Sequence, residues 1–278
     1  MPATTERGFS LVELAVVLTI VALLLGGALY TLSAQTEARN LGETERRLEH
    51  ARELLLGFAI ANGRLPCPAT LAAGSGDEAP TTGGACTAAY AGYLPARAIG
   101  FTPMDTSGYG LDVWGNRIRY AVSVNSNLAG NPDNVFTTAP VSPSTGIKYN
   151  FNPSSGTNLT PQDLLVCTAY DSSTGSTSTS APSCGTGASA VPATNTSTVV
   201  AVIWSQGRNF STASFSGTSG QAGADEALNN KTTTNSNHGV FVHHPPRPFS
   251  EANAYDDQLV WIPAGMLYGR MIAAGAVP

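Results

Sequence analysis

The chain has 278 residues, a net charge of −5, 42% hydrophobic residues and only 12% charged residues. This apolar content can build a real core, so an intrinsically disordered chain is excluded, and the length allows one large domain or two modest ones. The negative charge argues against a nucleic-acid-binding protein, which would show a basic stripe or patch.

The N-terminus combines an apolar segment with a charged one. Residues 14–36 carry no charge, whereas residues 37–53 contain nine charged side chains. A 23-residue helix is about 35 Å long, which is enough to cross a bilayer. A secretory signal peptide would need a basic start, a shorter apolar run and a small-residue cleavage site, and none of these fits. The segment is therefore predicted to lie in a membrane, with an uncleaved signal anchor as the simplest alternative.

Glu13 does not suit a simple anchor, because it lies at the mouth of the apolar run. A carboxylate at membrane depth costs on the order of 2.5–3.5 kcal/mol on insertion scales unless it is paired or near the interface. If the chain is cut just before Phe9, the new α-amino group supplies a cation at the same depth. Glu13 can then pair with that group in an adjacent subunit.

Residues 7–14 read RGFSLVEL and resemble the processing site of the type IV pilin and type II secretion pseudopilin superfamily. In that family a prepilin peptidase cuts after the glycine and N-methylates the new first residue. The glutamate four residues further on guides the subunits into a helical filament. The resemblance implies cleavage after Gly8, N-methylation of Phe9 and a filament-assembly role for Glu13.

The same resemblance implies partners and a location. The expected partners are prepilin peptidase, other pilin or pseudopilin subunits, the inner-membrane assembly platform, and membrane lipid before assembly. No nucleic acid is expected, given the net charge. The protein would cross the bacterial inner membrane once with its head in the periplasm, and would then enter a pilus or pseudopilus.

The helix is predicted to continue beyond the membrane to residue 62. Apolar residues recur with helical spacing and predict a face that packs on a globular head. This stripe consists of Leu41, Leu48, Ala51, Leu55 and Phe58. The pair Asn62 and Gly63, followed by Pro66, is typical of a helix end. The expected organisation is a leader at 1–8, a transmembrane or filament-core half-helix at 9–36, an amphipathic half-helix at 37–62 and an exported head at 63–278.

The head is predicted to be β-rich with long polar loops. Candidate strands are short β-branched and aromatic runs at 118–124, 164–170, 199–205, 239–243 and 258–263. The largest loop, 171–198, has 15 Ser or Thr among its 28 residues. The C-terminal segment 266–275 is predicted to form a final helix or strand on the head. The fold class is α+β and pilin-like: a long N-terminal helix packed on an antiparallel sheet.

Four cysteines, Cys67, Cys86, Cys167 and Cys184, all follow the apolar segment. A head exported to an oxidising compartment can form disulfides, and three connectivities are possible. The local connectivity, Cys67–Cys86 with Cys167–Cys184, would close two short loops and stabilise each by about 3 kcal/mol. Zinc is the competing interpretation, but the sequence has no Cys-x-x-Cys pair.

Recognisable catalytic motifs are absent, so the sequence predicts a structural protein, with no enzyme activity, no cofactor and no metal. The adjacent pair His243 and His244 would point to opposite faces of a strand and would not share a metal. Asp256 and Asp257, with Glu251 nearby, have the ligand chemistry of a calcium site, but a turn-forming pair before a strand explains them equally well. Whether they bind calcium stays open.

Three functions remain in competition. The expected one is a minor pilin or pseudopilin, because the head is large for a bulk filament subunit. The second is a major filament subunit, which differs from the first in its abundance. The third is an exported enzyme or binding domain that uses a pilin-type anchor, and it would need a clustered polar site in the head.

Overall fold

The computed structural model describes residues 10–124, 134–141, 145–151, 159–187, 190–211, 224–231, 239–247 and 254–277, without the side chains of residues 25–34, 211 and 224. The chain divides into two compact units, Met1–Glu43 and Thr44–Pro278. The first long helix contributes to both units, and the second unit holds both sheets. The expected leader at 1–8 lies outside the described residues.

The first helix, α1, extends over Leu11–Asn62, close to the predicted 9–62. It ends where the sequence indicates: Gly63 has a φ of 68°, a left-handed conformation that favours glycine. The Gly63 amide donates to the Ala59 carbonyl at 2.8 Å, and the Asn62 side chain donates to the Phe58 carbonyl at 2.9 Å. These bonds satisfy carbonyls that would otherwise be left open at the helix end.

Within the first unit, the described part of α1 is an apolar helix without a covering layer. Large side chains between residues 11 and 24 are exposed, for example Leu23 at 73% and Leu24 at 68%. Among the residues described, no helix combines the length and hydropathy that a membrane crossing requires. The expected membrane half at 9–36 includes residue 9 and the side chains of 25–34, which lie outside the described part of the chain.

The main sheet contains four antiparallel strands in the order β1-β2-β5-β7. Their bounds are Gly92–Tyr93 (β1), Arg119–Val122 (β2), Val199–Ser205 (β5) and Gln258–Pro263 (β7). The central strand β5 is buried along its whole length, as expected for a run of β-branched residues between two neighbouring strands. It pairs with β2 through Ala121 opposite Val202 and with β7 through Val202 opposite Trp261.

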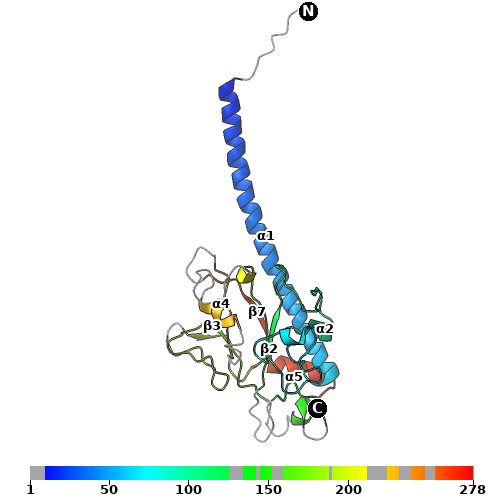
Figure 1. Ribbon diagram of the computed structural model, residues 1–278. Coiled ribbons are helices and arrows are strands. Elements are labelled where there is room, and N and C mark those ends of the chain that lie inside the picture. Colours follow the sequence, from blue (N-terminus) through cyan, green and yellow to red (C-terminus); the bar gives the residue numbers. More distant parts are fainter. Residues whose placement is uncertain are drawn as a thin grey trace, which may run out of the picture. The chain divides into compact units, whose positions relative to one another are not determined.

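The C-terminal half of α1 packs on this sheet (Figure 1). The buried helix residues are Leu48, Ala51, Leu55, Leu56 and Ala59. The predicted stripe is therefore largely right, but Leu41 and Phe58 are only partly buried. Leu56 and Ala59 complete the buried face, because a core-facing stripe is wider than a single row of side chains.

A second sheet has the order β4-β3-β6, with Leu165–Ala169 (β3), Val191–Pro192 (β4) and Val240–Val242 (β6). Strands β3 and β4 are antiparallel, whereas β3 and β6 are parallel. The purely antiparallel head expected from the sequence is therefore wrong for this pair. A parallel pair needs a long crossover, and some 70 residues separate the two strands along the chain, including β5 of the main sheet.

Short helical segments join the strands. Their bounds are Leu71–Ala73 (η1), Ala96–Ile99 (α2), Gly146–Asn150 (α3), Asn209–Ser211 (η2) and Ala224–Asn229 (α4). The last helix, α5, comprises Ala264–Ala273, directly follows β7 and lies beside the end of α1 (Figure 1). Its side chains Leu267 and Met271 are fully buried in the main core. The C-terminal segment is thus a helix, one of the two predicted outcomes.

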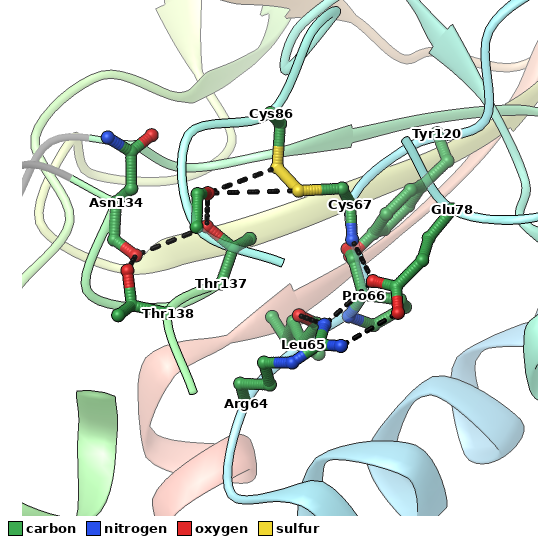
Figure 2. The surroundings of a disulfide bond; sticks show 11 residues. Arg64, Leu65, Pro66, Cys67, Glu78, Cys86, Tyr120, Asn134, Thr137 and Thr138 are labelled. Carbon is green, nitrogen blue, oxygen red and sulfur yellow. Dashed lines mark hydrogen bonds and ion pairs between the residues drawn. A yellow bond between two sulfur atoms is a disulfide. The ribbon is translucent and has the colours of Figure 1, made fainter. Parts of the chain in front are cut away.

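The four cysteines form the two local disulfides, Cys67–Cys86 and Cys167–Cys184. The first lies beside a buried ion pair just after α1 (Figure 2). Arg64 donates two hydrogen bonds of 2.7 Å to the two carboxylate oxygens of Glu78. Glu78 also accepts the backbone amide of Cys67 at 3.0 Å. The helix end, the disulfide and the following loop are thereby joined in one network.

Removing the first disulfide, by Cys67→Ser together with Cys86→Ser, is expected to lower the free energy of unfolding by about 3 kcal/mol. Denaturant unfolding of the oxidised protein measures this loss. The double variant at Cys167 and Cys184 is a matched comparison, because the two loops have sequence separations of 19 and 17 residues. A change below about 1 kcal/mol in both variants would contradict a stabilising role for the bridges.

Candidate functional site

The beginning of α1 has a reciprocal hydrogen-bond arrangement. The Ser10 amide donates to Glu13 Oε2 at 3.0 Å, and the Glu13 amide donates to Ser10 Oγ at 3.2 Å. This is the capping box of a helix N-terminus, with a serine at the cap and a glutamate three residues later. It fixes where the helix begins and places the Glu13 carboxylate in the first turn, where the helix dipole favours a negative charge.

The surroundings of Glu13 are apolar. Leu11, Val12 and Leu14 expose 86%, 71% and 56% of their surfaces, and Glu13 itself is exposed. If another molecule covered these apolar side chains, the Glu13 carboxylate would be buried with them, and burial of an unpaired charge costs free energy. A cation beside the carboxylate would offset that cost. The site is therefore suited to pairing with a positive group of a neighbouring molecule. The predicted cleavage point between Gly8 and Phe9 lies outside the described residues.

The second unit holds its portion of α1 through polar as well as apolar contacts. Arg47 donates to the backbone carbonyls of Leu111 and Asp112, at 3.2 and 2.7 Å. The Asp112 carboxylate accepts the amides of Trp114 and Asn116 and so closes the turn before β2. Burial raises the pKa of Asp112 above its ordinary value, and these hydrogen bonds oppose that rise.

A cluster of three buried carboxyl groups is the most acidic site in the described part of the head. Glu226 of α4 meets Asp256 and Asp257, with one oxygen of each within 4.8 Å of the others. Asp256 accepts the amides of Arg208 and Asn209, Glu226 accepts the Asn209 side chain and the Asp256 amide, and Asp257 accepts the Asn229 side chain. Such oxygens suit a hard cation such as calcium, but N–H donors already stabilise each carboxyl group.

Burial dominates the electrostatics of this cluster. It raises the pKa of Glu226 to about 7, with a further contribution from the charge of Asp256. It also raises the pKa of Asp257 well above its ordinary value, and the charge of Glu226 adds to that effect. Carboxyl groups this close cannot all ionise without mutual repulsion, so protons remain on the cluster in the folded protein.

Two buried cations lie elsewhere in the head. Lys231, just after α4, donates to the Val240 carbonyl and lies over the Phe241 ring at 4.4 Å. Burial, with a smaller contribution from the nearby charge of Arg119, lowers its pKa to about 7. Arg119 lies over the rings of Tyr93 and Trp204 and donates to the Lys231 carbonyl. Both cations are thus held by carbonyl oxygens and aromatic faces.

The stability of the head is expected to pass through a minimum near pH 7. Between about pH 4.5 and 7 the folded state keeps the Glu226 proton that the unfolded chain releases, so stability falls as the pH rises. Between about pH 7 and 10.5 the unfolded chain keeps the Lys231 proton that the folded state releases, so stability rises with pH. The fall below pH 7 and the rise above it each change the free energy of unfolding by on the order of 2 kcal/mol after allowance for solvent screening.

Thermal unfolding between pH 5 and 9 measures this profile. Glu226→Gln should reduce the fall in stability below pH 7, to which the raised pKa of Asp257 still contributes. Lys231→Met should reduce the rise in stability above pH 7. A stability maximum near pH 7 in the unaltered protein would contradict the burial of these ionisable groups.

The two adjacent histidines directly follow β6, so the expected strand pair is wrong, and they have different neighbours. His244 contacts Asp225 through Nε2 at 3.1 Å and stacks on Tyr255 with ring centroids 3.9 Å apart. His243 lies edge-on to Trp261 at 6.0 Å, and burial lowers its pKa. Both histidines nevertheless border the same cavity of about 360 Å³.

Sequence reasoning located some of these groups and missed others. It singled out Glu13, Asp256 and Asp257, but it paired the two aspartates with Glu251, which lies outside the described residues. The third carboxyl group comes from Glu226, some 30 residues earlier. No local signal marks that residue, because α4 and the segment before β7 meet only in the folded head.

Comparison with known proteins bears on the N-terminus. A family model described as the prokaryotic N-terminal methylation motif matches residues 4–29. No curated protein and no solved structure matches the chain. The matched range includes Gly8, Phe9 and Glu13, so the resemblance stated from residues 7–14 is confirmed.

Proposed function

We propose that the chain is a minor subunit of a type IV pilus or a type II secretion pseudopilus, and its N-terminal methylation motif, which supports a type IV pilin-like prepilin, favours this proposal. Its action is mechanical and not enzymatic. Before assembly the subunit is anchored in the bacterial inner membrane with its head in the periplasm. The assembly platform then transfers it into a filament of pilin-like subunits.

Processing precedes assembly. Prepilin peptidase removes residues 1–8 after Gly8 and N-methylates Phe9. The new terminus then begins a helix whose segment 9–36 lies in lipid and later in the filament core. Segment 37–62 continues under the head, which comprises residues 63–278. The family motif supports this order of events.

The observation that carries the proposal is the position of Glu13. It lies in the first turn of α1, four residues after the proposed new terminus, among exposed apolar side chains. In a filament the helices would cover these side chains, and the α-amino group of a neighbouring Phe9 would neutralise the carboxylate. This pairing would fix the axial register of each subunit, because only one offset brings the two charges together.

The size of the head favours a minor subunit. The second compact unit, Thr44–Pro278, is much larger than the helical shaft of the first unit. A bulk subunit repeats along the whole filament, whereas a minor one is present in few copies, so a large head is more easily accommodated at the tip. The long loops of the head are then available to contact a surface or another subunit.

Quantitative proteomics of sheared filaments tests this assignment. If the chain is a minor subunit, it is present in the filament fraction at far fewer copies than the main subunit. A chain that dominates the fraction would be the major subunit. A chain confined to the membrane fraction would instead be an exported domain that uses a pilin-type anchor.

A further inference from the structure

A shallow cavity of about 720 Å³ opens beside the end of β7, where this edge strand of the main sheet meets the second sheet. Trp261 and Pro263 of β7 line it together with Leu165 of β3 and Pro192 of β4. The remaining walls come from residues 182–185, which include Cys184 of the second disulfide, and from Ala193, Thr194, Asn195, Thr196 and Thr198. This volume is within the range of small-molecule sites.

The walls are electrically neutral. None of the described residues that line the cavity carries a charge; the polar ones offer hydroxyl groups and one side-chain amide. A charged ligand would lose hydration on entering without gaining an opposite charge. The chemistry therefore selects a neutral ligand with both apolar and hydroxyl-bearing surfaces.

The amide belongs to Asn195, and the chain fixes its orientation. Asn195 Oδ1 accepts the Ser197 amide and the Thr196 hydroxyl, each at 3.2 Å. The Thr198 hydroxyl donates to the Asn195 carbonyl at 2.6 Å and closes the turn. These bonds occupy the oxygen of the side chain and leave its NH₂ group as a donor with no partner in the described part of the chain. Asn195 is exposed, so this oriented donor is accessible to a ligand oxygen, which would replace water there.

This turn is also anchored to the second sheet. Thr194 Oγ1 accepts the Val166 amide at 3.0 Å, and the disulfide Cys167–Cys184 joins β3 to the opposite wall. Proline rings at positions 182, 192 and 263 add rigid apolar surface. A rigid site loses little conformational entropy when a ligand binds.

Trp261 provides an aromatic surface in the same cavity. Its half-buried ring is held edge-on to His243. The faces of an aromatic ring carry negative potential, so they attract C–H groups that are polarised by neighbouring oxygens. A pyranose ring presents such C–H groups on its face and hydroxyl groups around its edge.

From this combination we propose that the cavity binds a neutral carbohydrate. The sugar ring stacks on Trp261 and the prolines, and a sugar hydroxyl accepts a hydrogen bond from the Asn195 amide. The Ser183 and Thr196 hydroxyl groups border the same space and exchange hydrogen bonds with the remaining sugar oxygens. This binding does not require filament assembly, so the proposal stands independently of the function proposed above.

Titration of the full chain, in a detergent without sugar groups, tests the site. The probes are maltohexaose, cellohexaose and chitohexaose, with a sulfated hexasaccharide as the charged comparison, and the readouts are calorimetry and tryptophan emission. We expect at least one neutral probe to bind saturably and to shift the emission. Failure of all three, or preferential binding of the sulfated probe, would overturn the proposal.

Two variants localise the binding. Asn195→Asp keeps the side-chain oxygen that accepts the Ser197 amide and the Thr196 hydroxyl but replaces the NH₂ donor with a negative oxygen, so affinity should fall at least tenfold. Asn62→Asp makes the same chemical change at the exposed end of α1 and should leave affinity unchanged. Trp261→Phe retains a smaller ring and should weaken binding less than Asn195→Asp.

Unchanged affinity in both cavity variants would refute the assignment. An emission shift that depends on protein concentration alone would also refute it, because a second copy of the chain would then occupy the cavity.

Discussion

Glu13→Gln is expected to abolish entry of the chain into filaments while leaving removal of the leader intact. Glutamine retains the oxygen that accepts the Ser10 amide, so the capping box and the helix start are preserved. Only the negative charge is lost. The variant therefore loses the proposed pairing with the neighbouring N-terminus. Loss of the charge also removes a cost of about 3 kcal/mol for placing the carboxylate in the membrane. The lipid-embedded state of the variant is therefore favoured roughly a hundredfold over that of the unaltered chain.

Immunoblots of sheared filaments and membranes measure this partition. Ser10→Ala is the matched control: it removes the hydroxyl of the capping box but keeps the Glu13 charge, and it should change filament incorporation only slightly. If Glu13→Gln enters filaments normally and Ser10→Ala does not, helix capping matters at this position and the charge does not.

Glu78→Ala is expected to destabilise the head by about 3–5 kcal/mol. Arg64 and Glu78 are both only 7% exposed and share two hydrogen bonds. Truncation leaves the Arg64 charge buried without its partner and leaves the Cys67 amide without its acceptor. The loss is large because the effect includes an unpaired buried charge as well as a missing contact.

Denaturant unfolding compares this variant with Glu53→Ala. Glu53 and Arg270 also form an ion pair, at 3.2 Å, but both side chains are more than half exposed. Solvent screens such a pair, so its loss should cost less than about 1 kcal/mol. Equal losses in the two variants would contradict the inference that burial determines the contribution of the Arg64 pair. The combined change Arg64→Met with Glu78→Leu should cost less than Glu78→Ala alone.

Local patterns were sufficient for most of the main sheet and for the long helix. The runs 199–205 and 258–263 became β5 and β7 with the predicted bounds, because β-branched and aromatic residues between polar loops have few alternatives to a buried strand. Gly63 ends α1 because it adopts a left-handed conformation that few other residues tolerate.

Structural features that depend on contacts between residues far apart in the sequence could not be predicted from local patterns. Strands β3 and β6 pair in parallel, and the long connection between them includes β5, the central strand of the other sheet. The approach of Glu226 to Asp256 depends on the same folding of the head. The ion pair of Arg64 with Glu78 joins the two ends of a loop. Cys67 lies in that loop, but nothing local in the sequence indicated that the two charges would meet. In each case the partners have no periodic or motif signal in common.

Mass spectrometry of the N-terminal peptide from filaments sheared off the native cell tests whether the chain is a processed filament subunit. We expect a peptide that begins at Phe9, with one methyl group on its α-amine and without residues 1–8. The same terminus is expected in the membrane pool, because processing precedes assembly. A chain that retains residues 1–7 and is found only in the membrane fraction would contradict the claim, since Glu13 would then have no adjacent α-amino group to meet.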